Sequence, residues 1–152
     1  MYSKKEESFL REQFWTTFGQ YISPVPSAEG VNINWINYKS GIRFIHVKME
    51  VQNGLAYIGI EISHKDLMIQ RVFFDHFKLL QVEFEETVSE KWIWEQRIKI
   101  DDKEISRIYI LLKQVNIYKK DDWPQIISFL KRRILLFDIF WCKHKEIFKM
   151  LD

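Results

Sequence analysis

The stretch IHVKMEVQNGLAYIGIEI, residues 45–62, decides the fold class of this chain. Asn53-Gly54 at its centre is the strongest two-residue signal for a β-hairpin turn. If these two residues form the loop, Gln52 faces Leu55 and His46 faces Glu61 across the two strands. The stretch therefore predicts an antiparallel hairpin with a defined register.

This register divides the hairpin into an apolar face and a polar face. Because successive side chains of a strand point to opposite sides, the apolar face holds Ile45, Val47, Met49, Val51, Ala56, Ile58, Ile60 and Ile62. The polar face holds His46, Lys48, Glu50, Tyr57, Glu61 and Ser63. A slip of one residue would mix the two sets, so the pattern supports the register. Gly59, inside the second strand, is typical of a place that another backbone or a ligand approaches closely.

Outward from the hairpin, the period of the apolar residues predicts helices and further strands. Ser3 and Glu6 have the spacing of a helix capping box, and Asp121-Asp122-Trp123-Pro124 is typical of a helix start. We expect helices at 3–21, 65–90 and 121–151, and strands at 32–37, 42–51, about 55–63, 92–100 and 105–112. The order α-β-β-β-α-β-β-α predicts an α+β fold: one domain over residues 1–152, with an antiparallel sheet of about five strands and three helices.

The last predicted helix has an unusually wide apolar arc. Its apolar residues cover nearly half of the circumference at about 100° per residue, which is more than one sheet face normally needs. Two arrangements would explain this arc. The helix is sandwiched between the sheet and a second helix, or part of it forms a homodimer contact.

Composition places the chain among soluble globular domains. Of 152 residues, 23 are Lys or Arg and 21 are Asp or Glu, so the net charge of +2 gives no sign of a strongly basic nucleic-acid-binding protein. No apolar run is long enough to span a membrane, so we expect no membrane partner. The N-terminus has no secretory h-region, and the single cysteine, Cys142, is typical of a reducing compartment. We therefore expect a cytoplasmic protein.

The polar hairpin face is the one place where the sequence indicates a site. His46 and Glu61 are directly opposed, with Cβ atoms on the order of 5 Å apart, and Lys65 follows just past the strand end. Groups at strand ends often bind ligands or catalyse reactions. The alternative is an exposed sheet face with ordinary cross-strand charge pairs, each worth at most about 1 kcal/mol.

Five blocks of the sequence resemble a known bacterial family. They are FWTTFGQY (14–21), PSAEG (26–30), NWINY (34–38), EISHKD (61–66) and DDWP (121–124). In this order they resemble the domain of unknown function DUF4268, over nearly the whole chain. That family has no established activity. Its members occur alone and attached to nuclease-like regions, which implies a link to nucleic-acid-processing systems.

The predicted order of elements is also similar to the core of PD-(D/E)XK nucleases, a restriction-endonuclease-like fold. This resemblance implies a divalent-metal site in which Glu61, Lys65 and His46 are catalytic and Glu61 and His46 hold Mg²⁺ or Mn²⁺. The sequence departs from the nuclease pattern, because Ser63 stands where the motif has lysine. Glu50 is displaced by four residues, about 13 Å, from the level of Glu61, so the second acid cannot be named.

Two further sets of residues could contact nucleic acid. Lys131, Arg132 and Arg133 make the last helix locally basic, and such residues either form a solvated helix face or contact phosphates. Trp92 and Trp94 lie on one strand face, where they either pack in the core or stack on bases.

We expect a non-catalytic interaction or accessory module with no resident cofactor, whose partners could include nucleic acid. The alternative is an atypical nuclease that needs Mg²⁺ or Mn²⁺.

Overall fold

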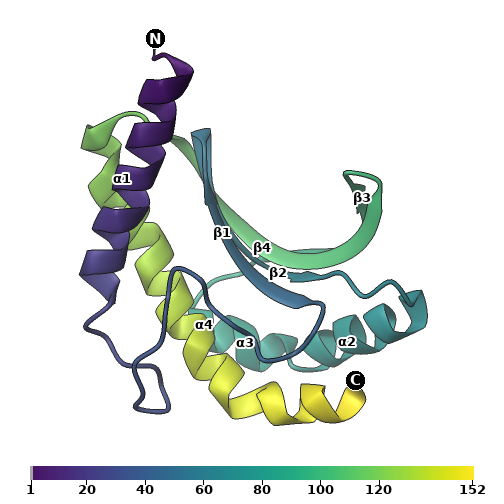
Figure 1. Ribbon diagram of the computed structural model, residues 1–152. Coiled ribbons are helices and arrows are strands. Elements are labelled where there is room, and N and C mark those ends of the chain that lie inside the picture. Colours follow the sequence, from purple (N-terminus) through teal and green to yellow (C-terminus); the bar gives the residue numbers. More distant parts are fainter. Residues whose placement is uncertain (1) are drawn as a thin grey trace.

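The computed structural model describes residues 2–152 (Figure 1). The helices are α1 (Lys4–Ile22), α2 (Leu67–Leu79), α3 (Gln81–Val88), the short 3-10 helix η1 (Lys120–Asp122) and α4 (Trp123–Leu151). The strands are β1 (Ile45–Val51), β2 (Asn53–Ile62), β3 (Ile93–Ile100) and β4 (Lys103–Asn116). The fold class is α+β, as the sequence predicts. None of the helices in this part of the chain combines the length and the apolarity that a membrane crossing needs.

The four strands form one antiparallel sheet in the order β1-β2-β4-β3. The hairpin register is the predicted one, because His46 pairs with Glu61 and Val51 pairs with Ala56. The sheet is strongly curved, and Figure 1 shows the helices α2, α3 and α4 on its convex side. The apolar hairpin face is this convex side, so Ile58 and Ile60 are fully buried beneath the helices. The polar face lines the concave side, which no helix covers in Figure 1.

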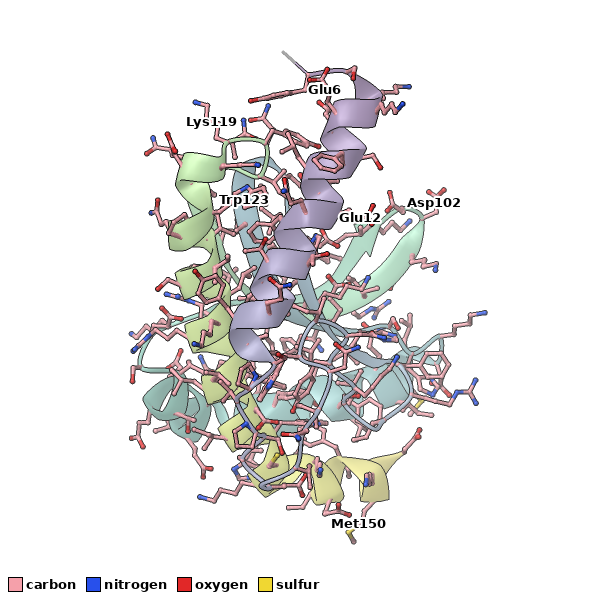
Figure 2. All side chains as sticks on the ribbon, turned by 60° about the vertical axis from the view of Figure 1, so that its left-hand side comes forward. Glu6, Glu12, Asp102, Lys119, Trp123 and Met150 are labelled. Atoms are coloured by element: carbon pink, nitrogen blue, oxygen red, sulfur yellow. The ribbon has the colours of Figure 1, made fainter. Side chains whose placement is uncertain are left out.

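Irregularities in the strands accompany this curvature. The pairing register shifts between Asn53 and Leu55 on β2, and again between Glu95 and Ile98 on β3. Such bulges bend a strand and increase its twist. Within the second shift Arg97 takes a positive φ of 52°. The β3–β4 hairpin therefore curls away from the helices, and Figure 2 shows Asp102 at its tip.

Helix α4 runs along the helical side of the sheet and contacts the sheet and three other helices. It packs on β2 and β4 on one side and on α1, α2 and α3 on others. Phe77 of α2 stacks on Trp141, and Phe84 of α3 meets Phe140 edge to face. At the other end of α4, Trp123, labelled in Figure 2, meets Phe14 of α1 edge to face. Packing on the sheet and on three helices thus covers much of the wide apolar arc of α4 within the chain, and the homodimer contact stays a prediction.

One predicted strand is wrong. The stretch 32–37 lies in an irregular connection between α1 and β1, so the sheet has four strands in residues 2–152 rather than five. Trp35 is buried and its indole N–H donates to the Val25 carbonyl at 2.8 Å. The alternation of apolar and polar residues around Trp35 therefore reflects a single side chain anchored in the core, because no neighbouring strand pairs with this segment.

One predicted helix is divided in two. The helix expected at 65–90 breaks at Leu80, whose backbone N–H donates to the carbonyls of both His76 and Phe77. The break turns α3 relative to α2, so that each follows a different part of α4. Residues 2–152 thus contain four α-helices instead of the expected three. No glycine or proline marks the break, and the apolar spacing continues across it.

Candidate functional site

Glu61 is held by two neighbours on the concave face of the sheet. Its Oε1 pairs with the Lys48 ammonium at 3.1 Å, and its Oε2 accepts a hydrogen bond from the Tyr57 hydroxyl at 2.9 Å. The Glu61 side chain is only 12% exposed. Both carboxylate oxygens therefore have partners within the sheet, and the carboxylate ties β1 to β2.

Tyr57 reaches Glu61 by lying over Gly59. A Cβ atom on Gly59 would come within 2.5 Å of the Tyr57 hydroxyl and 2.7 Å of the Tyr109 Cβ. The two tyrosine rings stack with centroids 5.4 Å apart. Burial and the Glu61 carboxylate raise the pKa of Tyr57, so this phenol stays protonated and donates. The groups that closely approach Gly59 are therefore the side chains of Tyr57 and Tyr109, and not a ligand or another backbone.

Arg107 completes the centre of the concave face. Its guanidinium lies 4.1 Å from the centre of the Tyr109 ring, and its Nε donates to Glu95 at 2.8 Å. Cations over aromatic rings and half-buried ion pairs both fix side-chain positions. The charges at the centre of this face are thus neutralised within the sheet.

The three predicted site residues lie around two adjoining cavities at the end of the hairpin. One cavity has a volume of about 290 Å³ and is lined by His46, Glu61 and others. The second, of about 630 Å³, is lined by His46, Lys65 and others. Both include Ser63 and Lys103. We call this region the corner site, defined by Arg43, Phe44, His46, Ser63, Lys65 and Lys103.

His46 does not contact Glu61 in the way that the pairing of their backbones suggests. The hydrogen-bond and ion-pair partners of Glu61 among residues 2–152 are Lys48 and Tyr57. Partial burial lowers the pKa of His46, and the positive charges of Lys48 and Lys39 lower it further. These effects outweigh the Glu61 carboxylate, which raises the pKa of His46, so a neutral imidazole is favoured.

Phe44 has a strained backbone at the corner site. Its φ of 67° lies in the left-handed region, which is unusual for a bulky residue and often marks a functional position. The Ser63 N–H donates to the Phe44 carbonyl at 2.8 Å and fixes this conformation. The Phe44 ring lies between the His64 ring, at 4.6 Å, and the Arg43 guanidinium, at 5.0 Å. The Arg43 guanidinium and the Phe44 ring thus lie together on the wall of the larger cavity, and the His64 ring is tilted against Phe44.

Three cations of the corner site have no carboxylate partner. Arg43, Lys65 and Lys103 form no ion pair within residues 2–152. Of the two acids on the wall of the larger cavity, Glu104 is paired with Arg97 at 3.2 Å, and Asp102 has no ion-pair partner within residues 2–152, so the unpaired cations outnumber the unpaired acid. The corner site is locally basic, and its unpaired cations can bind an anion.

Comparison with known proteins identifies the family. The family model described as "Domain of unknown function (DUF4268)" matches residues 10–145. The chain belongs to the DUF4268 family. No curated protein and no solved structure matches the chain. The DUF4268 match runs from α1 into α4, so it includes the whole sheet and the corner site.

The DUF4268 chain offers little to a divalent metal near Glu61. Within residues 2–152, no group of three or more His, Cys, Asp or Glu side chains is arranged to hold a metal ion. Glu61 already binds an ammonium and a phenol, and Lys65 lies on the wall of a cavity that Glu61 does not line. These residues do not fit the metal centre that the nuclease resemblance implies.

The other predicted contact residues of the DUF4268 chain lie in the helical layer or against it. Trp92 is 5% exposed, and both Trp92 and Trp94 meet the Phe84 ring edge to face, so the packing alternative describes them. The Arg133 guanidinium pairs with Glu90 at 2.8 Å and lies over the Phe129 ring.

Lys131 and Arg132 have no ion-pair partner in residues 2–152, and Lys131 lines a groove between α1 and α4. The structure does not bring these two helix residues to the corner site.

The sequence signals missed two members of the corner site. Arg43 and Phe44 precede β1 and carry no motif, and the positive φ of Phe44 has no signature in an aromatic residue. Lys103 belongs to the polar run Asp101-Asp102-Lys103-Glu104, which predicts a turn and not a site. What the sequence did indicate was the location, because His46 and Lys65 bracket the end of the hairpin.

Proposed function

We propose that this DUF4268 domain is a non-catalytic binding module that holds single-stranded nucleic acid at the corner site. The unpaired cations Arg43, Lys65 and Lys103 around a cavity of about 630 Å³ are the observation that supports this proposal. Cations of this kind bind phosphate oxygens and release counterions. A chain of nearly neutral net charge can bind a polyanion if its unpaired cations are gathered in one place.

The Phe44 ring and the neighbouring Arg43 guanidinium favour a single strand. Unpaired bases stack on aromatic rings and on guanidinium planes, which a duplex does not offer. Phe44 is half-buried, so one part of its ring is supported by the protein and another is accessible. The strained Phe44 backbone presents this ring beside the phosphate-binding cations.

The bonds of Glu61 favour binding over catalysis. A carboxylate that ligates a metal must offer its oxygens to the ion, and the two oxygens of Glu61 are bound to Lys48 and Tyr57. A divalent cation at Glu61 would compete with the Lys48 ammonium for Oε1, so a hydrolytic role would require this ion pair to break. The single unpaired Cys142 accords with an intracellular, cytoplasmic location for this module.

Fluorescence anisotropy with a labelled oligothymidylate of about 16 nucleotides tests the proposal. We expect binding that weakens with salt, and a slope of log K against log salt that falls by about 0.7 for each of Arg43→Ala, Lys65→Ala and Lys103→Ala. Lys113→Ala is the matched control, because Lys113 is exposed and unpaired at the opposite end of the sheet. Absence of binding, or equal losses in the control, would overturn the proposal, and tighter binding of a duplex would overturn single-strand recognition.

The nuclease alternative has one observation in its favour. Asp101 lines the 290 Å³ cavity together with His46 and Glu61, so an acid from the hairpin tip is near. This alternative is tested by incubating single- and double-stranded DNA with Mn²⁺ or Mg²⁺ and the wild type, Glu61→Ala and Asp101→Asn. Cleavage that both substitutions abolish would establish the nuclease, and uncut DNA at high enzyme concentration would refute it.

A further inference from the structure

A second cavity, separate from the corner site, lies between the α1–β1 connection and α4. Its volume is about 350 Å³. The buried side chains of Tyr38, Asp138 and Trp141 form its floor. Asn34, Asn37 and Lys39 are exposed and lie at its rim. The size suits a small metabolite rather than a polymer.

The floor of this cavity contains a buried carboxylate with only neutral partners. Asp138 is 2% exposed. Its Oδ2 accepts from the Ala28 N–H at 2.7 Å, and its Oδ1 accepts from the Tyr38 hydroxyl at 2.6 Å and the Cys142 thiol at 3.4 Å. No Lys, Arg or His of residues 2–152 forms an ion pair with it. A buried carboxylate is normally paired with a cation, because desolvating a lone charge is costly.

The neighbours of Asp138 stay protonated and cannot share its charge. Burial raises the pKa of Tyr38, and the hydrogen bond to Asp138 raises it further. Burial and the Asp138 charge raise the pKa of Cys142 to about 12. The nearest lysine on α4, Lys145, is bound to Glu29 at 2.7 Å. The Asp138 carboxylate therefore lines the cavity with three neutral hydrogen-bond donors around it.

The rim has the opposite character. Lys39 forms no ion pair within residues 2–152, and the amides of Asn34 and Asn37 lie on the same wall. Such groups bind a carboxylate. Ile33 and the Trp141 ring supply an apolar wall between the floor and the rim. The cavity thus has a carboxylate at its floor, the mutually paired Lys145 and Glu29 in its lining, an unpaired cation and two amides at its mouth, and an apolar side.

We propose that this cavity binds a small zwitterion of the α-amino-acid class with an apolar side chain. The ligand ammonium pairs with Asp138, which has no other cation as a partner within residues 2–152. The ligand carboxylate is bound by Lys39 and by the amides of Asn34 and Asn37. The apolar side chain packs against Ile33 and Trp141. A ligand of this class supplies the cation that the buried carboxylate lacks.

Three matched probes test the charge pattern: L-leucine, 4-methylpentanoate, which lacks the ammonium, and 3-methylbutylamine, which lacks the carboxylate. Thermal unfolding and isothermal titration calorimetry are the measurements. We expect L-leucine to raise the unfolding temperature most, the amine to raise it less, and the acid to have no effect. The proposal is overturned if none of the probes stabilises the protein, or if the acid binds as well as the amine.

Two variants separate binding from folding. Asp138→Asn keeps the size of the side chain and removes its charge, so we expect the Kd for L-leucine to rise about tenfold or more. Because this variant could also lose stability, Asn37→Trp provides a second test: it covers the mouth of the cavity from an exposed position and leaves Asp138 intact. Asn32→Trp, on the same connection but outside the cavity lining, is the control and should bind L-leucine as the wild type does. If Asn37→Trp binds L-leucine as the wild type does and Asn32→Trp loses binding, the ligand does not occupy this cavity.

Discussion

At the residue scale, Gly59 shows how a single missing side chain shapes the concave face. The space above its Cα is occupied by the Tyr57 ring and by the Tyr109 Cβ. Neither group can move freely, because Tyr57 is bonded to Glu61 and the Tyr109 Cβ is fixed to its backbone. The glycine therefore allows the strands to close around two stacked tyrosines.

We predict that Gly59→Ala destabilises the protein by about 1–3 kcal/mol, because the added methyl group overpacks this contact. Gly19→Ala is the matched control. Gly19 lies in α1, and a Cβ there would lie 3.6 Å from Ile36, an ordinary contact. We expect this second change to stabilise by up to about 1 kcal/mol through helix propensity. Urea unfolding checks both, and equal effects of the same sign would contradict the interpretation.

His76 makes stability depend on pH. Its Nε2 is buried without a hydrogen-bond partner among the described residues, and burial, with His144 nearby, lowers its pKa below the ordinary 6.5. The folded state thus binds this proton more weakly than the unfolded chain does. The contribution to stability is complete above the unfolded pKa and is lost as the pH falls toward the folded value.

We therefore predict that the urea midpoint of the wild type falls between about pH 7 and pH 5. His76→Phe keeps the ring that packs on Phe148 but cannot titrate, so its midpoint should fall less over the same range. The measurement is the difference between the two pH profiles, which removes the contribution of all other groups. Parallel profiles would show that His76 is not a source of the pH dependence.

At the element scale, a half-buried ion pair joins α4 to the turn between α3 and β3. Arg133 binds Glu90, and both side chains are mostly covered. The other oxygen of Glu90 accepts from the Trp92 indole at 3.0 Å. The Arg133–Glu90 pair therefore links α4 to the start of β3, at the point where Glu90 also holds the Trp92 indole.

A double-mutant cycle with Arg133→Met and Glu90→Gln should give a coupling free energy of about 1.5 kcal/mol, because charge-assisted bonds are stronger when shielded from water. Glutamine keeps an oxygen for Trp92. The control cycle is Arg71→Met with Asp75→Asn, a pair on α2 whose side chains are 73% and 59% exposed. We expect about 0.3–0.5 kcal/mol there. A control coupling as large as the first would disprove the role of burial.

Also at this scale, local signals in the sequence predicted some elements and not others. The hairpin was predictable because Asn53-Gly54 fixes the turn and the alternation of faces fixes the register. The break at Leu80 was not, because the apolar spacing runs on through it and the bend is imposed by packing on α4. The false strand at 32–37 arose from Trp35, whose burial is a tertiary contact.

The same distinction applies to the two sites. His46 and Lys65 were predictable members of the corner site, since the register and the strand end are local properties. Phe44 was not, because its positive φ is fixed by a bond from Ser63 across the sheet. The cavity at Asp138 was beyond sequence reasoning altogether, because residues about a hundred positions apart along the chain form it.

At the scale of the whole molecule, the position of α4 leads us to predict that the protein is a monomer. The sheet and three helices already cover its apolar arc, and only Ile139, Ile147 and Met150 remain as exposed large apolar residues on it. We expect light scattering to give the mass of one chain, 18.6 kDa, at micromolar concentration. A mass of two chains, returned to one by Ile147→Lys, would instead support the homodimer.

The irregular connection between α1 and β1 also has a consequence for how the protein is made. Its bonds to Asp138 and to the indole of Trp141 join residues 100 to 110 positions apart. During synthesis the chain is delivered from its N-terminus, so this connection leaves the ribosome long before its partners on α4 do. The segment can become ordered only after translation of α4 is complete. Stalled or truncated chains that lack α4 should therefore be cut by proteases between α1 and β1, where the finished protein resists them.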